Sequence, residues 1–256
     1  MRVPLPEVFL TTPLAHRAYH KRSEGRPENS LPAMRAAIAV GYGIECDLQL
    51  TKDGQALAFH DEWLERLTIA KGFVRDHTLA QMQAIGLKDC AEPAPSLAQV
   101  LALVAGRVPL LIELKDPTDT MSDTDGRLEA ATVAALSGYS GPVALMSFNP
   151  HVAAHLARLA PAIPRGLTTA AYDHEGWAPL SPARCDELRE IADYDRTQSS
   201  FISHEAADLG RARVAELKEG GAAILTWTIR SSADEAKARA VAQNITFENY
   251  AAPFPA

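Results

Sequence analysis

The sequence predicts an α/β protein, a (β/α)8 barrel. Short apolar runs of strand length alternate with helical patterns from one end of the chain to the other. The alternation yields eight strands, each but the last followed by a helix, and 256 residues suit the roughly 250 of such a barrel. A doubly wound sheet is the alternative. It is disfavoured because no glycine-rich phosphate loop of the Rossmann or P-loop type follows any predicted strand.

The first half of the chain is expected to contain three strands, at residues 14–17, 41–50 and 108–115. Ser30 and Ser96 each precede apolar residues that recur at helical spacing, so both are predicted to cap helices. Asp53-Gly54 is a turn signal between two extended pieces.

The second half repeats the pattern without an obvious linker. Strands are predicted at residues 142–148, 163–169, 199–203, 222–229 and 244–247, and helices at 126–138, 150–160, 181–193, 206–219 and 231–242. We therefore expect residues 1–256 to form a single domain, with a short insertion between the second and third strands at about residues 50–95.

Composition narrows the possible partners. A hydrophobic content of 47% with 22% charged residues is ordinary for a soluble globular protein. The net charge of −7 argues against a nucleic-acid partner, although a few local cations suffice for a phosphate substrate. Cys46, Cys90 and Cys185 have neither metal nor disulfide spacing, and we see no signal peptide and no apolar segment of membrane-spanning length. A cytoplasmic protein is expected, and nothing in the sequence indicates its oligomeric state.

Three carboxylates are expected to meet at the mouth of the barrel. Alternation along a strand places Glu45 and Asp47 on one face, and Glu113 lies near the end of the next strand. Parallel strands bring these ends together, where unneutralised acids would raise one another's pKa. A divalent cation resolves the repulsion, and ligands with oxygen atoms alone favour Mg²⁺ or Ca²⁺. The alternative is that each acid is an ordinary barrel residue paired with Lys115 or Arg17.

Two histidines adjoin this cluster. His60, followed by Asp61, ends an extended piece, and His16 ends the first strand. A side chain with an ordinary pKa near 6.5 exchanges protons at neutral pH, so we interpret the two as an acid–base pair. Four other histidines have no such setting and are interpreted as surface residues: His20, His77, His174 and His204.

Two further groups of residues are interpreted as having no catalytic part. His151 and His155 have the four-residue spacing of a helical metal site, but the glutamate of a metalloprotease motif is missing. Lys21, Arg22 and Arg26 form a basic cluster that fits a solvated loop, with attraction of an anionic substrate as the alternative.

Taken together, the motifs resemble those of the glycerophosphodiester phosphodiesterase family. The resemblance is strong over residues 14–115 and thinner beyond, where Ser147-Phe148 and Thr226-Trp227-Thr228 are similar to the family's later strand ends. The residues that carry it are His16-Arg17, Pro27-Glu28-Asn29-Ser30, Glu45, Asp47, Thr51-Lys52-Asp53-Gly54, His60-Asp61 and Glu113-Leu114-Lys115.

The resemblance implies a TIM barrel that hydrolyses a small phosphodiester, a glycerophosphodiester, to glycerol 3-phosphate and an alcohol with a divalent metal. It implies metal binding by Glu45, Asp47 and Glu113, acid–base roles for His16 and His60, and substrate contacts from Arg17, Lys115, Glu28 and Trp227. A lysophospholipase D-like enzyme, with Trp63 and Phe73 as an apolar lip, is one alternative. A non-catalytic phosphodiester-binding barrel is another.

Three positions depart from the family pattern. Ala18 replaces the glycine that usually follows His-Arg, and Arg230 replaces an asparagine after the Trp-Thr strand. The last strand ends with Glu248-Asn249 in place of the usual Thr-Asp. We expect the last two departures to affect the outer pocket rather than the class of reaction.

Overall fold

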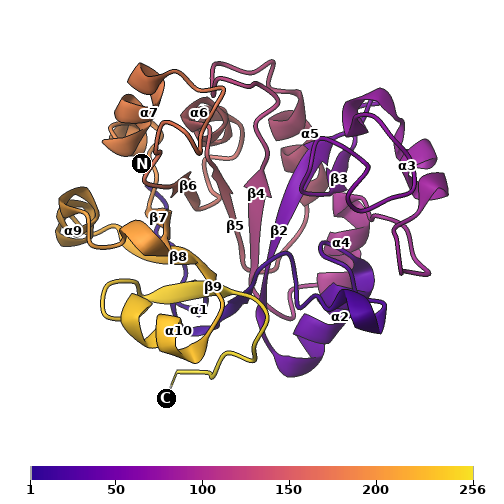
Figure 1. The fold of residues 1–256 in the computed structure, drawn as a ribbon, viewed down its shortest axis with the longest axis horizontal. Coiled ribbons are helices and arrows are strands. Elements are labelled where there is room, and N and C mark those ends of the chain that lie inside the picture. The colour runs from indigo at the N-terminus through magenta and orange to yellow at the C-terminus, as the bar shows by residue number, and fades with distance from the viewer. Residues whose placement is uncertain (1, 256) are drawn as a thin grey trace. The chain divides into compact units, whose positions relative to one another are not determined.

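The computed structural model describes residues 2–255, which form two compact units. The N-terminal unit comprises residues 14–115 and 126–143. The C-terminal unit comprises residues 2–13, 116–125 and 144–255. Parallel strands with helices between them make up each unit (Figure 1).

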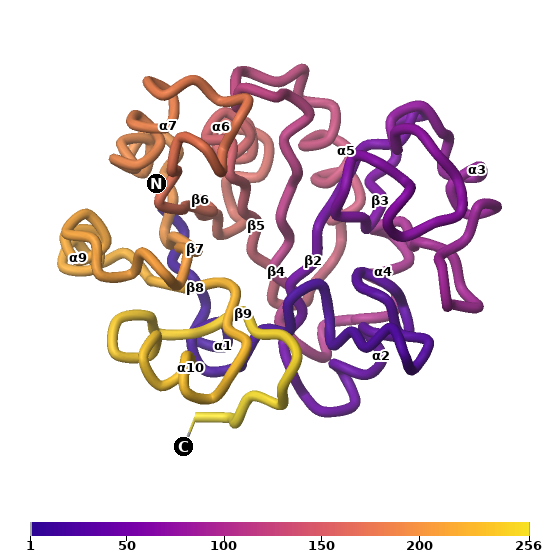
Figure 2. Tube along the Cα trace, in the orientation of Figure 1, coloured from indigo at the N-terminus to yellow at the C-terminus, as the bar shows by residue number. Residues whose placement is uncertain are grey.

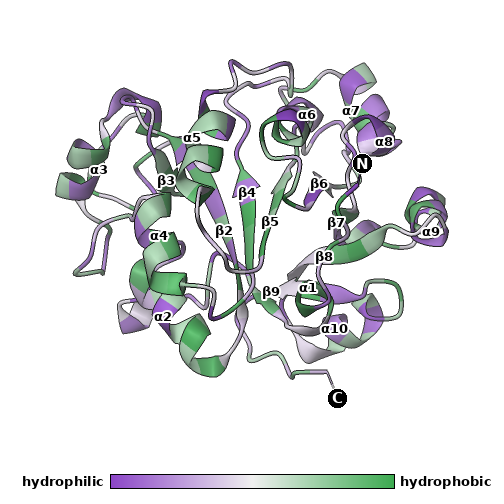
Figure 3. Ribbon diagram, turned by 180° about the vertical axis from the view of Figure 1, so that it is seen from behind, coloured by the Kyte–Doolittle hydropathy of each residue, from purple (hydrophilic) through white to green (hydrophobic). Residues whose placement is uncertain are grey.

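The N-terminal unit is built around β2 (Gly43–Leu50), which pairs in parallel with β1 (Leu14–Ala15) and β4 (Leu110–Leu114). β3 (Ala56–Ala58) turns back antiparallel on β2, as the Asp53-Gly54 turn predicts. The register of this pair aligns Asp47 with Glu113. The neighbouring paths of β2 and β4 can be followed in Figure 2. β4 is buried along its whole length and is drawn largely in the hydrophobic colour in Figure 3.

The caps predicted for two helices of this unit are confirmed. The side chain of Ser30 accepts the N3 amide of α2 (Leu31–Val40), and Ser96 forms a capping box with Gln99 at α4 (Leu97–Val104). The remaining helices are α3 (Leu79–Ile85), α5 (Arg127–Leu136) and the 3-10 turns Arg22–Glu24 and Val74–Asp76.

The segment between β2 and α4 has apolar packing of its own. We call its buried residues the insertion cluster: Leu57, Phe59, Leu64, Leu67, Val74, Met82, Leu87 and Ala94. Satellite clusters of this kind form beneath long loops and fix their path. The loop that follows β3 and carries His60 is held by this cluster.

The C-terminal unit repeats the strand–helix alternation. Its strands pair in parallel in chain order: β5 (Val143–Ser147), β6 (Arg165–Thr169), β7 (Phe201–Glu205), β8 (Ala223–Ile229) and β9 (Asn244–Phe247). Its helices are α1 (Val8–Thr11), α6 (Pro150–Leu159), α7 (Pro182–Arg189), α8 (Asp193–Arg196), α9 (Ala212–Glu219) and α10 (Ser232–Ala238), with a 3-10 turn at Ala206–Asp208. The amide of Asn244 donates to the carbonyls of Phe9 and Thr12, which ties α1 to β9. Within residues 2–255, no helix is both long enough and apolar enough to cross a membrane.

Three predicted elements differ in extent. The first strand ends at Ala15 because Arg17 and Ala18 adopt left-handed backbone angles that no strand tolerates. The helix predicted at 181–193 is interrupted, with Ile191 also left-handed between α7 and α8. The helix predicted at 206–219 begins as a 3-10 turn and becomes α-helical only at Ala212.

The surface position predicted for His204 is wrong. Its side chain is fully buried, with Nδ1 2.8 Å from Thr169 Oγ1 and Nε2 3.2 Å from Asp208 Oδ2. Burial lowers the pKa of His204, partly offset by Asp208. Both ring nitrogens of the buried imidazole therefore have polar partners. Of the other three, His174 is exposed as predicted, whereas His20 and His77 are half-buried.

Candidate active site

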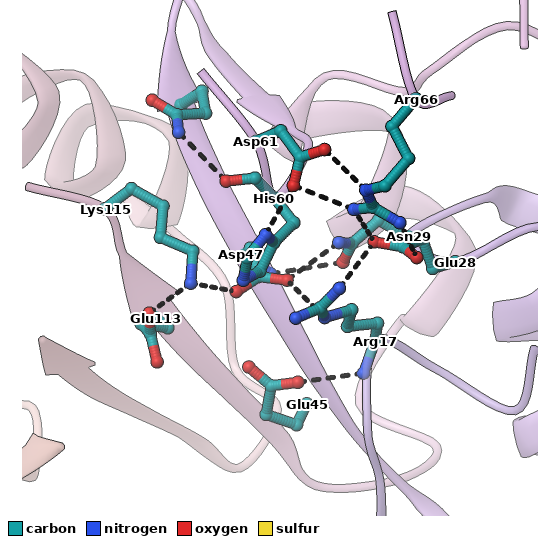
Figure 4. Close-up of polar contacts among 11 residues, drawn as sticks. Arg17, Glu28, Asn29, Glu45, Asp47, His60, Asp61, Arg66, Glu113 and Lys115 are labelled. Atoms are coloured by element: carbon teal, nitrogen blue, oxygen red, sulfur yellow. Dashed lines mark hydrogen bonds and ion pairs between the residues drawn. The ribbon is translucent and has the colours of Figure 1, made fainter. Parts of the chain in front are cut away.

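Three carboxylates lie together on β2 and β4 (Figure 4). Glu45, Asp47 and Glu113 each offer an oxygen atom, and these atoms all lie within 4.8 Å of one another. Each residue is at most 5% exposed. Ca²⁺ and Mg²⁺ bind oxygen at about 2.0–2.6 Å, so ligands on opposite sides of one ion are about 4–5 Å apart. The trio fits one such ion, and it is the only group of this kind among residues 2–255.

Lys115 satisfies two of these acids. Its Nζ lies 2.7 Å from Asp47 Oδ1 and also donates to Glu113. Burial alone would raise the pKa of Asp47, but the charges of Lys115, His60 and Arg17 hold it well below its ordinary value. The alternative interpretation of ordinary ion pairs is therefore correct for part of the cluster.

Glu45 is less well compensated. One carboxylate oxygen accepts the backbone N–H of Arg17 at 2.8 Å. Burial, followed by repulsion from Asp47 and Glu113, raises the pKa of Glu45 well above its ordinary value. A buried carboxylate in this position favours an added positive charge.

A count of the charged groups gives the same result. Five carboxylates (Glu28, Glu45, Asp47, Asp61 and Glu113) face three cations (Arg17, Arg66 and Lys115) in this network. With Glu45 ionised and the histidines neutral, the network is short of two positive charges. One divalent cation would supply them.

The turn after β1 presents Arg17 to the acids. Arg17 and Ala18 have φ angles of 51° and 66°, a region that costs a residue with a Cβ about 1–2 kcal/mol. Ala18 thus adopts a glycine-like backbone although it carries a methyl group. The turn directs the backbone N–H of Arg17 to Glu45 and its Nη1 to Glu28 at 2.8 Å, with Nε 3.7 Å from Asp47.

Asn29 is a site residue to which sequence reasoning assigned no role. Its Nδ2 donates to Asp47 Oδ2 at 2.8 Å, and its Oδ1 accepts the backbone N–H of Asp47 at 3.1 Å. These two bonds fix the carboxylate that lies between Arg17 and Lys115. The signal was its place in the Pro27-Glu28-Asn29-Ser30 motif.

His60 follows β3, and its side chain contacts a carboxylate. Its Nδ1 lies 2.8 Å from Asp61 Oδ1, and its carbonyl accepts Gln49 Nε2 at 3.0 Å. Because Nδ1 is engaged, Nε2 is the ring nitrogen that could contact a bound molecule. Asp61 is itself held by Arg66, and neither of these partners was assigned a role from the sequence.

His16 and Trp227 are the remaining predicted site residues. His16 is half-buried and directly follows β1, one residue before Arg17. Trp227 belongs to the C-terminal unit, where its Nε1 donates to the Ser203 carbonyl at 3.0 Å and its ring meets Phe148 edge-on at 5.4 Å.

Two other observations concern the C-terminal unit. The departures at Arg230 and Glu248 contact each other, with Arg230 Nε 2.8 Å from Glu248 Oε1. His155 Nε2 lies 2.9 Å from Asp123 Oδ1, and His151 Nδ1 lies 3.7 Å from the same oxygen. Both histidines of the pair therefore contact the same carboxylate, that of Asp123.

Known proteins resemble this chain in sequence and in fold. The family model described as the Glycerophosphoryl diester phosphodiesterase family matches residues 16–245. The glycerophosphodiester phosphodiesterase of Caldanaerobacter subterraneus subsp. tengcongensis is 32% identical over 167 residues, which cover 61% of this chain and 66% of that protein. The glycerophosphodiester phosphodiesterase of Bacillus subtilis is 26% identical over 218 residues, covering 75% and 68%.

A solved structure extends the likeness to the fold. The Oleispira antarctica phosphodiesterase in complex with the product sn-glycerol-3-phosphate aligns with a TM-score of 0.75 at 22% identity, over 94% of each chain. This likeness shows the predicted fold class, a closed barrel of eight parallel strands with helices between them.

Proposed function

We infer the reaction from the premise that this chain belongs to the glycerophosphoryl diester phosphodiesterase family and is a phosphoric diester hydrolase. We propose that it hydrolyses glycerophosphodiesters to glycerol 3-phosphate and an alcohol, and that the reaction depends on Mg²⁺ or Ca²⁺. The observation that supports this most is the trio Glu45, Asp47 and Glu113 beside Arg17, Lys115 and His60. The product bound to the Oleispira antarctica enzyme supports glycerol 3-phosphate as the product here.

The proposed ligands of the cation are Glu45, Asp47 and Glu113. The ion, when bound, supplies a Lewis acid that polarises the phosphate and lowers the pKa of the attacking hydroxyl. Arg17 and Lys115 bind phosphate oxygens and stabilise the charge that develops on them. Both already face the acids with their charged ends, Arg17 at 3.7 Å and Lys115 at 2.7 Å from Asp47.

His16 and His60 are proposed to exchange the protons. One takes the proton of the attacking hydroxyl, and the other protonates the departing alcohol. Asp61 keeps the imidazole of His60 in one orientation through the 2.8 Å contact at Nδ1. The attacking hydroxyl is either the neighbouring glycerol hydroxyl or water. The first route passes through a cyclic phosphate that phosphorus NMR would detect.

The test of the reaction is a substrate panel. Glycerophosphocholine and glycerophosphoethanolamine should each release glycerol 3-phosphate, measured with glycerol 3-phosphate dehydrogenase. Bis(p-nitrophenyl) phosphate serves as a phosphodiester without glycerol. Hydrolysis of that compound alone would contradict a glycerophosphodiester substrate, because the glycerol would then contribute nothing to recognition.

A lysophospholipase D-like reaction is the second candidate, favoured by exposed apolar side chains in the segment that follows His60. Trp63 is 52% exposed and packs on Phe73 at 3.8 Å between ring centroids, and Ile69 is 87% exposed. Such groups provide a surface for an acyl chain. Lysophosphatidylcholine in the same panel, assayed for choline release, decides between the two. The Trp63→Ala variant should lose activity on the lysolipid alone if this candidate is correct.

Asn29 is expected to tune the affinity for the ion. Asn29→Ala removes both hydrogen bonds that hold Asp47, and losing such support typically weakens metal binding about 10–100-fold. The concentration of Mg²⁺ or Ca²⁺ that gives half-maximal activity should rise by that factor, with activity approaching the wild-type level at saturating ion. An unchanged ion dependence would show that Asp47 is fixed without Asn29.

The cellular compartment is also a proposal. We place the reaction in the cytoplasm because Cys46, Cys90 and Cys185 are all free.

A further inference from the structure

Arg66 bridges two carboxylates with its whole guanidinium group (Figure 4). Nε and Nη2 donate to Asp61 at 2.6 and 2.8 Å. Nη1 and Nη2 donate to Glu28 at 2.6 and 2.8 Å. Two paired contacts on one planar group make the strongest and most directional arrangement available to an ion pair.

Each of these carboxylates holds a group for which a catalytic part is proposed. Asp61 Oδ1 lies 2.8 Å from Nδ1 of His60, and Glu28 Oε1 accepts Nη1 of Arg17 at 2.8 Å. Arg17 comes from the turn after β1, Glu28 from the segment before α2, and His60 from the loop after β3. Arg66 therefore joins three segments that are distant in sequence.

We propose that Arg66 is a positioning residue that fixes His60 and Arg17 relative to each other, through Asp61 and Glu28. The proposal rests on the proposed function, because it assigns Arg66 no contact with the substrate. It predicts that the imidazole of His60 and the guanidinium of Arg17 are held in position together, so that displacing one displaces the other.

The chemistry of the contact requires arginine. The side chains of Glu28 and Asp61 are 12% and 21% exposed, so they are largely shielded from water. Without a cation between them they would repel each other, and their partners would lose a fixed orientation. Lysine carries its donors on one nitrogen and cannot form a paired contact with each of two carboxylates.

Holding the loop in place is the competing explanation for these contacts. The loop already has anchors on either side of Arg66, since Leu64 is 0% and Leu67 is 5% exposed within the insertion cluster. The apolar packing thus accounts for the fold of the loop. The contacts of Arg66 are aimed at the two carboxylates that face the site.

The experiment compares the kinetics of Arg66→Ala, Arg66→Lys and wild type on glycerophosphocholine. Misplacing a reacting group by about 1 Å costs on the order of 100-fold, so Arg66→Ala should lower kcat by about 100-fold. Arg66→Lys should recover part of that loss. Arg75→Ala is the matched control, because Arg75 is an ion-paired arginine of the same segment, 3.0 Å from Glu62, and should keep wild-type kinetics.

Chemical rescue separates positioning from folding. Millimolar guanidinium chloride, far below denaturing concentrations, should restore part of the kcat of Arg66→Ala and none of His60→Ala. In the double variant Asp61→Asn/Arg66→Ala, the loss of kcat relative to wild type should be smaller than the product of the two single losses. The two effects do not multiply because the two residues act through one contact. Circular dichroism and melting temperature establish that each variant is folded.

The outcomes are distinct. A kcat for Arg66→Ala within threefold of wild type, while His60→Ala is inactive, would overturn the positioning role and leave the proposed function standing. A low kcat without guanidinium rescue and with full multiplicative effects in the double variant would also overturn it. A wild-type protein inactive on every glycerophosphodiester would instead refute the proposed function.

Discussion

Treatment with EDTA is expected to abolish hydrolysis by this protein, and Mg²⁺ or Ca²⁺ is expected to restore it. The acids Glu45, Asp47 and Glu113 lie within one ion's reach, in a network two positive charges short of neutrality. A Lewis acid contributes several kcal/mol to the transition state, so the loss should reach about 10³-fold. Activity measured while each ion is returned separately decides between Mg²⁺ and Ca²⁺. Full activity in EDTA would contradict the role of the trio.

A variant of one ligand extends this test to stability. Glu45→Gln keeps an acceptor for the Arg17 N–H and removes a poorly compensated charge. Without the ion, its melting temperature should equal or exceed that of wild type. With the ion, wild type should gain stability by ligand linkage and the variant should not.

The matched control for this variant is Glu24→Gln, which removes a carboxylate paired with Lys21 and Arg26 on the surface of the same unit. It should respond to the ion as wild type does. A wild-type response in Glu45→Gln would mean that the ion binds elsewhere.

His60→Ala and His16→Ala are each expected to reduce kcat by about 10²–10⁴-fold, the usual worth of a positioned acid or base. Folding should be unaffected, because both side chains are only half-buried. The matched control is His174→Ala, another histidine paired with an aspartate, Asp186, at 3.0 Å. Retained turnover in both active-site variants would remove the acid–base assignment.

The leaving group distinguishes the acid from the base. In an ester of glycerol 3-phosphate with p-nitrophenol, the leaving group is p-nitrophenolate, which departs without being protonated. The variant that lacks the general acid should therefore keep near-normal activity on this ester. The variant that lacks the base should remain slow on both substrates. Equal losses for His16→Ala and His60→Ala on this ester would contradict a division of roles.

The strands could be predicted from the sequence because alternation and length determine them. The run that becomes β2 alternates acids with apolar residues, and this pattern also placed Glu45 and Asp47 on the face that Glu113 shares. α3 went unrecognised because its seven residues are too few to show a clear helical period. The left-handed residues that shorten β1 carry no local signal, since neither is a glycine.

The candidate site was predictable where strands, or the residues directly after them, position it, since His16, Arg17 and His60 were predicted as well as the carboxylates. Parity along β2 and β4 suffices for the three carboxylates. Asn29, Asp61 and Arg66 reach the site through the paths of turns, which depend on tertiary packing rather than on periodicity. The burial of His204 escaped prediction for a similar reason, because its partner Asp208 lies in a 3-10 turn that follows β7.

The insertion cluster has a consequence for how the enzyme loses activity on warming. We expect the segment held by this cluster to open as a separate cooperative unit, at a lower free energy than the paired strands. Such an opening would carry the imidazole away from the acids while the strands stayed hydrogen-bonded. We expect the half-life of activity on warming to be governed by a subglobal event in residues 59–94, beyond the paired residues of β3, and proteolytic nicking there should track inactivation more closely than the melting temperature does.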